Sequence, residues 1–170
     1  MNDLIYKHPM DSVRFTKPVR APDDIHFLTR DEQIRFLEVA KRSHNYNQYA
    51  LILETGLRTG EMIGLTWDAI DFEKRTLTVN KTLEYRHKQH FWRAGPPKTQ
   101  QSYRTIPLTD RAYEILKEIK DKRPWQKESP LLWQTLEYID RRTGAISRLV
   151  MRDLVFINWR TGEPAKNSSY

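Results

Sequence analysis

The sequence predicts an α+β domain in which helices pack beside a small antiparallel sheet. Apolar residues recur at helical spacing between residues 29 and 56 and again between residues 109 and 119. Between these regions, residues 76–83 alternate between apolar and polar side chains, which is the pattern of a half-buried strand. No internal repeat or low-complexity tract occurs. We therefore expect one folded unit over residues 28–170, preceded over residues 1–27 by a proline-containing linker or the tail of another domain.

The N-terminal helices have defined start and stop signals. Thr29, with Glu32 three positions later, forms a capping box that predicts a helix start. Three apolar residues then share one face of this helix: Ile34, Leu37 and Ala40. A second helix is indicated by residues at the i, i+3, i+4 and i+7 positions: Tyr46, Tyr49, Ala50 and Leu53. Gly56 is placed to end it, and a short third helix is expected to begin near Thr59.

Strands are predicted over the central part of the chain. Leu77, Val79 and Leu83 alternate with threonines, which predicts a strand. A glycine and two prolines at residues 95–97 then break the pattern, and residues 103–108 predict a further antiparallel strand.

The last third predicts a helix, a hairpin and a final strand. Thr109 is placed to cap a helix that ends at Pro124. Four residues of this helix are expected to face inward: Ala112, Ile115, Leu116 and Ile119. Residues 136–151 predict a hairpin whose turn contains Gly144, and residues 154–157 predict the last strand.

Positive charge is concentrated in one segment. Residues 74–111 carry nine Lys or Arg and two acidic residues, an excess of seven that equals the net charge of the whole chain. Ring-bearing side chains are interleaved with these charges: Tyr85, His87, His90, Phe91, Trp92 and Tyr103. Basic side chains can contact phosphates while rings pack on sugars and bases. The segment predicts a DNA-binding surface, and a solvated charged face is the alternative.

Several classes of protein and site are not indicated. Cysteine is absent, which removes disulfides and thiolate metal sites and suits a reducing cytoplasm. No run approaches eighteen apolar residues, so no membrane segment is expected. Glycine-rich phosphate loops are also absent. His87 and His90 with Glu84 are a weak metal set, because a spacing of three in a strand does not place side chains on one face. We expect neither a metal nor another cofactor.

Two linked motifs carry the most specific signal. Residues 56–71 read Gly-Leu-Arg-Thr-Gly-Glu-Met-Ile-Gly-Leu-Thr-Trp-Asp-Ala-Ile-Asp, and residues 98–108 read Lys-Thr-Gln-Gln-Ser-Tyr-Arg-Thr-Ile-Pro-Leu. In this order they resemble the tyrosine recombinase (phage integrase) family, and most closely the integrases of conjugative transposons and prophages of Gram-positive bacteria. The resemblance covers about residues 25 to 170. It implies that residues 1–27 are a linker or the tail of a preceding core-binding domain.

The resemblance implies a reaction on a DNA phosphodiester and assigns roles in it. Arg58 matches the first catalytic arginine, and Glu61, one helical turn later, would orient its guanidinium. Lys98 matches the catalytic lysine that protonates the departing 5′ oxygen. Arg104 and Thr105 are expected to touch backbone phosphates nearby. Within the basic segment, we also expect Lys88 and Arg93 to contact DNA.

The chain departs from the family after these motifs. Family members continue to a His-x-x-Arg box and a nucleophilic tyrosine. His90 and Arg93 have that spacing but precede Lys98, so we interpret them as unrelated to the box. Tyr170 follows a polar run, residues 167–169, that resembles a helix cap, and it is a poor candidate nucleophile. We therefore expect an incomplete catalytic domain that is inactive alone.

Three functions remain open at this point. The first is the N-terminal half of a recombinase that binds double-stranded DNA and whose full-length form self-associates on DNA, as the resemblance implies. The second is a non-catalytic DNA-binding module derived from a truncated integrase. The third is a basic scaffold that contacts protein partners or RNA.

Overall fold

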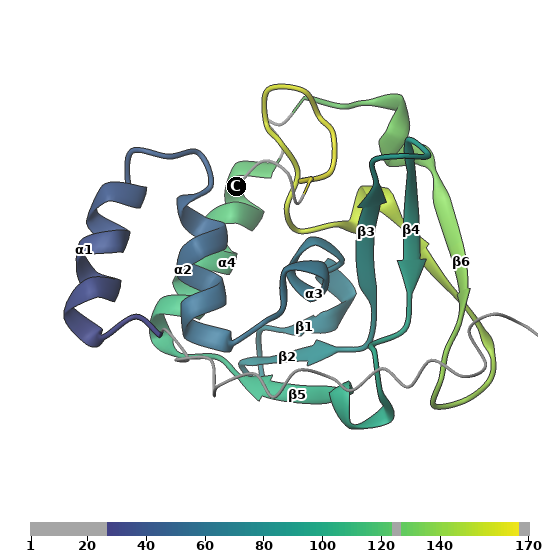
Figure 1. The fold of residues 1–170 in the computed structure, drawn as a ribbon, viewed down its shortest axis with the longest axis horizontal. Helices are drawn as coiled ribbons and strands as arrows, with labels where there is room; N and C mark the ends of the chain where they lie inside the picture. Colours follow the sequence, from purple (N-terminus) through teal and green to yellow (C-terminus); the bar gives the residue numbers. More distant parts are fainter. Residues whose placement is uncertain (1–26, 124–126, 167–170) are drawn as a thin grey trace, which may run out of the picture.

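The computed structural model describes residues 27–123 and 127–166. Its helices are α1 (Arg30–Ala40), α2 (Tyr46–Thr55), α3 (Thr59–Ile63) and α4 (Asp110–Lys122). Its strands are β1 (Ile70–Asp71), β2 (Thr76–Val79), β3 (Thr82–Arg86), β4 (Phe91–Gly95), β5 (Arg104–Pro107), β6 (Thr135–Ile139) and β7 (Ile146–Val150). Helices α1, α2 and α4 lie on one side, the strands lie on the other, and α3 lies between them (Figure 1). The α+β prediction is confirmed.

The strands form three small antiparallel sheets. One sheet has the order β1-β2-β5, and the other two are the hairpins β3-β4 and β6-β7. In the first sheet Thr78 pairs with Thr105, and in the second Glu84 pairs with Arg93. Pairing between β2 and β5 brings segments 27 residues apart into contact, so the second sequence motif joins the sheet whose strand β1 ends the first motif.

Helix α1 begins and α2 ends as predicted. Thr29 donates its backbone N–H to Glu32 Oε2 at 2.8 Å, and its hydroxyl accepts from the Glu32 N–H, which completes the capping box. Gly56 adopts a left-handed conformation with φ of 64°, so the helix can stop there without steric cost.

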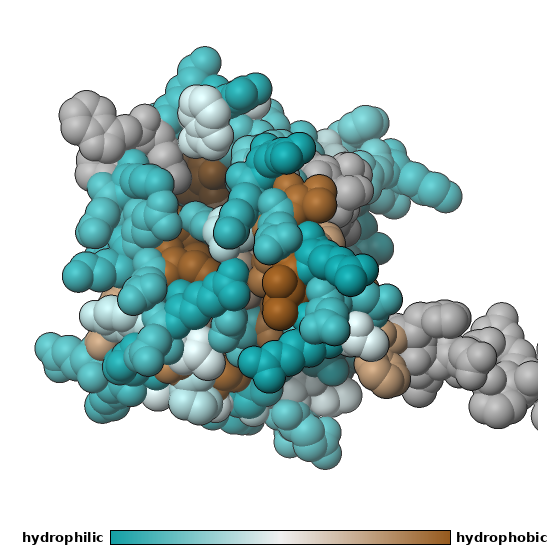
Figure 2. All heavy atoms as spheres, turned by 90° about the vertical axis from the view of Figure 1, so that its left-hand side faces the viewer, coloured by the Kyte–Doolittle hydropathy of each residue, from teal (hydrophilic) through white to brown (hydrophobic). Residues whose placement is uncertain are grey.

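One residue of the apolar face of α1 is exposed. Ala40 is buried and Leu37 packs against the core, but Ile34 is 51% exposed. The reason is that α1 is the outermost helix and packs mainly on α2 (Figure 1). Figure 2, which faces this helical side of the molecule, shows apolar atoms exposed among hydrophilic ones.

The strand predicted over residues 76–83 is divided between two sheets. Strand β2 ends at Val79, and β3 begins at Thr82 in a different sheet. Lys81 lies at the division with its side chain buried, and its Nζ donates to Thr66 Oγ1 at 2.5 Å and contacts Asp68. The contacts with Thr66 and Asp68 compensate the free-energy cost of burying this ammonium group, so Lys81 can lie inside the protein where the chain passes from one sheet to the next.

Helix α3 packs closely on β3. A Cβ on Gly64 would lie 2.7 Å from the backbone nitrogen of Leu83, so only glycine fits at this contact. Leu83, Met62 and Ile63 are buried in the core. The close contact fixes the position of α3, and with it the residue that precedes the helix.

The last third follows the prediction except at its end. Thr109 caps α4 by accepting from the Ala112 N–H, and the four residues predicted to face inward are buried. The β6-β7 hairpin forms, with Gly144 at φ of 71° in its turn. Pro124 and the segments 1–26 and 167–170, for which a helix end, a linker and a helix cap were predicted, lie outside the described residues.

Residues 154–157 do not form the predicted strand. Leu154 makes a single bridge to Thr66, and Ile157 makes a single bridge to Pro164. The segment thus pairs with two different partners for one residue each, and no continuous ladder develops. The continuous apolar run instead reflects burial of Leu154, Val155 and Phe156 in the core.

Candidate active site

Arg58 stands at the junction between α2 and α3. It is the N-cap residue of α3 and has extended backbone dihedral angles. Leu57, immediately before it, is buried, whereas the Arg58 side chain is 65% exposed. The buried leucine and the close packing of α3 hold the backbone, so the arginine projects from a fixed point.

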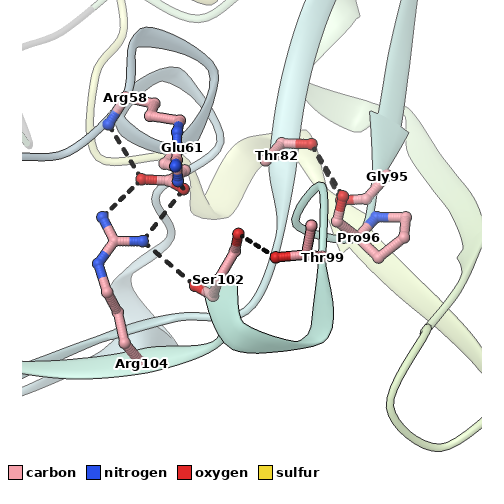
Figure 3. Close-up of polar contacts among 8 residues, drawn as sticks. All are labelled: Arg58, Glu61, Thr82, Gly95, Pro96, Thr99, Ser102 and Arg104. Atoms are coloured by element: carbon pink, nitrogen blue, oxygen red, sulfur yellow. Dashed lines mark hydrogen bonds and ion pairs between the residues drawn. The ribbon is translucent and has the colours of Figure 1, made fainter.

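Glu61 holds Arg58 from within the protein. Its side chain is only 2% exposed. Glu61 Oε2 accepts the backbone N–H of Arg58 at 2.9 Å, and Oε1 accepts from Arg58 Nη1 at the same distance (Figure 3). The contact expected from the three-residue spacing therefore exists, and the catalytic roles of both residues remain predictions.

Arg104 occupies the other side of the same carboxylate. Its Nη1 and Nη2 donate to Glu61 Oε1 and Oε2 at 3.1 and 2.8 Å. Nη1 also donates to the carbonyl oxygen of Ser102 at 3.2 Å, and the side chain is 30% exposed. The sequence predicted that Arg104 would contact a DNA phosphate, but the structure engages its guanidinium inside the protein.

The three charged groups stabilise one another. Burial acts to raise the pKa of Glu61, but hydrogen bonds from Arg104 and from the backbone and side chain of Arg58 outweigh it and hold that pKa below its ordinary value. The hydrogen bond to Glu61 raises the pKa of Arg104. Two positive charges and one negative charge leave the cluster with a net positive charge, which suits binding of an anion.

Lys98 lies in an exposed loop between β4 and the short 3-10 helix Gln100–Ser102. The loop is anchored on both sides. Thr82 Oγ1 donates to the carbonyl oxygen of Gly95 at 3.2 Å, and the hydroxyls of Thr99 and Ser102 lie 3.0 Å apart (Figure 3). Within residues 27–123 and 127–166, no hydrogen bond or ion pair engages the ammonium group of Lys98.

A continuous series of hydrogen bonds connects the two motifs. It runs from Arg58 through Glu61 and Arg104 to Ser102, and then to Thr99, the residue after Lys98. These five residues lie next to one another (Figure 3). The structure therefore joins the Arg58 junction to the loop that carries Lys98.

The other predicted DNA contacts are not joined to this cluster. Lys88 is exposed in the turn between β3 and β4, and Arg93 is exposed on β4 with an ion pair of 3.9 Å to Glu84. The five residues of β4, about 17 Å long at typical strand rise, separate the turn from the loop of Lys98. Thr105 is exposed on β5, with its hydroxyl 3.3 Å from that of Thr78.

Several rings of the basic segment pack against other side chains of the protein. Trp92 is buried and packs on Tyr85 with ring centroids 5.1 Å apart. Phe91 is 47% exposed. The ring of Trp92 is therefore not accessible to a sugar or base, whereas that of Phe91 is partly accessible.

His87 and His90 lie in the turn rather than in a strand. Among the described residues, no group of three or more His, Cys, Asp or Glu is arranged to hold a metal ion. In the same part of the chain, no helix is long and apolar enough to cross a membrane.

Comparison with known proteins identifies the family. The profile of the phage integrase family matches residues 26–159, and the chain belongs to this family. It is 31% identical over 124 residues to the transposase from transposon Tn916 of Enterococcus faecalis, and 32% identical over 105 residues to a XerC-like tyrosine recombinase of Caldanaerobacter subterraneus. These matches cover 69% and 57% of this chain but only 30% and 27% of the relatives.

Solved structures show the same fold. The Tn1549 transposon integrase, in complex with a circular intermediate DNA, superposes with a TM-score of 0.62 at 23% identity. The XerA recombinase superposes with a TM-score of 0.55 at 17% identity. The first match covers 88% of this chain and 44% of the integrase chain, so this chain corresponds to less than half of that structure.

Proposed function

We propose that this chain supplies the Arg58 and Lys98 part of the catalytic site of a site-specific DNA recombinase that works through a tyrosine. One observation carries the proposal: the exposed Arg58 is fixed by the buried Glu61 carboxylate, and hydrogen bonds connect this pair to the loop of Lys98, whose ammonium group has no partner among the described residues. Membership of the phage integrase family supports it, because several similar proteins are named as recombinases or transposases.

The proposed reaction exchanges one phosphodiester for another. A tyrosine hydroxyl attacks the scissile phosphorus, the bond to the 5′ oxygen breaks, and a 3′-phosphotyrosine and a free 5′ hydroxyl result. Attack by another 5′ hydroxyl reverses the step, so the number of phosphoester bonds is conserved and neither ATP nor a metal is required. In this proposal, neither the attacking tyrosine nor the His-x-x-Arg box is a residue of this chain.

Arg58 and Lys98 would do different work in this reaction. Negative charge grows on the nonbridging oxygens in the transition state, and a guanidinium with free N–H groups can donate hydrogen bonds to them. The departing 5′ oxygen needs a proton, and a flexible ammonium group can deliver it. Arg58 has the exposure for the first task. Lys98, whose ammonium group has no hydrogen bond or ion pair with the described residues, is available for the second.

The proposed partner is double-stranded DNA. The Tn1549 integrase is described in complex with circular intermediate DNA and with transposon end DNA. We propose that Lys88 and Arg93 extend the contact along the DNA backbone, that the full-length protein self-associates on DNA, and that it acts in the cytoplasm.

Binding of the 170-residue chain to duplex DNA is expected to weaken steeply with salt. Each phosphate that a basic side chain neutralises contributes about 0.9 to the log–log slope. Reversing two charges with Lys88→Glu and Arg93→Glu should therefore flatten the slope by about 1.8. Fluorescence anisotropy of a labelled duplex, titrated at several salt concentrations, measures this slope.

The matched control reverses two charges on the helical side of the molecule. Lys117→Glu and Lys122→Glu on α4 change the net charge equally and should leave the slope near its original value. An equal effect of both pairs would mean that net charge, rather than the β3-β4 hairpin, drives binding. A slope that does not respond to either pair would contradict the proposed DNA surface.

Alone, the chain is expected to form no covalent DNA adduct, because it is proposed to lack the family's attacking tyrosine. The assay uses a nicked duplex from which a short cleaved strand diffuses away, so that any 3′-phosphotyrosine accumulates. A denaturing gel then separates protein–DNA adducts from free DNA. An adduct that disappears in Tyr170→Phe would show that the chain carries its own nucleophile.

A further inference from the structure

The Glu61 carboxylate is shared between two arginines in an ordered way. It accepts four hydrogen bonds, two from Arg58 and two from Arg104. From Arg58 it receives the backbone N–H and a single guanidinium nitrogen. From Arg104 it receives both terminal guanidinium nitrogens, each on a different oxygen. This paired geometry is the one that fixes the plane of a carboxylate most firmly.

The two arginines also differ in what they present to solvent. The Arg58 side chain is 65% exposed, and that of Arg104 is 30% exposed. Arg104 is further held by the Ser102 carbonyl oxygen, so its terminal nitrogens already have partners. Arg58 keeps most of its guanidinium available for another anion.

We propose that Arg104 is a positioning residue that acts through Glu61 to present the Arg58 guanidinium to a DNA phosphate, and that it does not bind the phosphate itself. This inference rests on the proposed function and deepens it. By occupying both oxygens, Arg104 prevents the carboxylate from turning to form a paired contact with Arg58, which would draw that guanidinium inward. Arg104 also supplies the charge that keeps the cluster positive.

Arginine side-chain NMR of the 170-residue chain tests the proposal. On addition of a short duplex DNA, the Nε–Hε resonance of Arg58 should shift, and that of Arg104 should stay in place. Without DNA, both Arg104→Lys and Arg104→Gln should move the Arg58 resonance, because neither side chain reproduces the paired contact. When Glu61 is also replaced by Gln, the Arg104 substitutions should cause no further shift of the Arg58 resonance beyond that caused by Glu61→Gln alone.

The control is another arginine with a glutamate partner. Arg148 Nε donates to Glu137 Oε1 at 3.0 Å on the exposed face of the β6-β7 hairpin. Arg148→Lys should not move the Arg58 resonance. Backbone amide spectra establish that each variant is folded. If Arg104→Gln does not fold, Arg104→Lys and the DNA titration of the unmodified chain still decide the question.

Two results would overturn the proposal. One is a DNA-induced shift of Arg104 as large as that of Arg58, which would make Arg104 a direct phosphate contact. The other is an Arg58 resonance that Arg104 variants move equally with and without Glu61. Failure of the proposed function is a separate outcome. In that case DNA shifts neither the Arg58 nor the Arg104 resonance, whereas the effect of the Arg104 substitutions on Arg58 through Glu61 is still measured without DNA.

Discussion

Arg58→Ala is expected to slow strand cleavage about a hundred- to a thousand-fold in a full-length recombinase that contains this chain. The substitution removes hydrogen bonds to the phosphate oxygens at the stage when their negative charge grows. DNA binding should weaken far less, because many basic side chains contribute to it. Single-turnover accumulation of the covalent protein–DNA adduct, at saturating protein, measures the rate of this step.

Arg148→Ala provides the control for that experiment. Arg148 is exposed on β7, and its Nε donates to Glu137 Oε1 at 3.0 Å. It is not part of the Arg58 cluster, so its loss should leave the cleavage rate nearly unchanged. Similar rates for the two variants would remove Arg58 from the catalytic site.

Local signals in the sequence predicted most helix boundaries. Thr29, Gly56 and Thr109 act on backbone groups within a few residues, so their effect does not depend on the rest of the fold. Exposure of Ile34 depends on which helix lies outermost. The division of the strand near Lys81 depends on a contact with Thr66 fifteen residues away. Such contacts do not leave a pattern in the local sequence.

The same distinction applies to the site. Arg58 and Glu61 are three residues apart at a helix start, and this spacing alone predicts their contact. Arg104 is 43 residues from Glu61 and reaches it only because β5 pairs with β2. Because Arg104 belongs to the second sequence motif, its basic side chain suggested a phosphate contact. In the structure its partner is Glu61, within the protein. The burial of Lys81 among Thr66 and Asp68 was likewise missed.

Lys98→Ala is expected to slow cleavage of ordinary DNA about a hundred- to ten-thousand-fold in the same full-length recombinase, because the departing oxygen would leave without a proton. The effect should depend on the leaving group. A sulfur atom in place of the bridging 5′ oxygen leaves readily as a thiolate, so the proton becomes unnecessary. Lys117→Ala, which removes an exposed lysine from α4, is the control and should cleave both substrates at the normal rate.

The most direct test of the proposed site is therefore the cleavage rate of the sulfur-substituted DNA by the Lys98→Ala and Arg58→Ala enzymes, each compared with its own rate on ordinary DNA. If Lys98 is the proton donor and Arg58 stabilises the phosphate charge, the sulfur substrate restores the Lys98→Ala rate and leaves Arg58→Ala slow. Restoration of both variants, or of neither, would contradict the division of roles and return Lys98 to an ordinary phosphate contact.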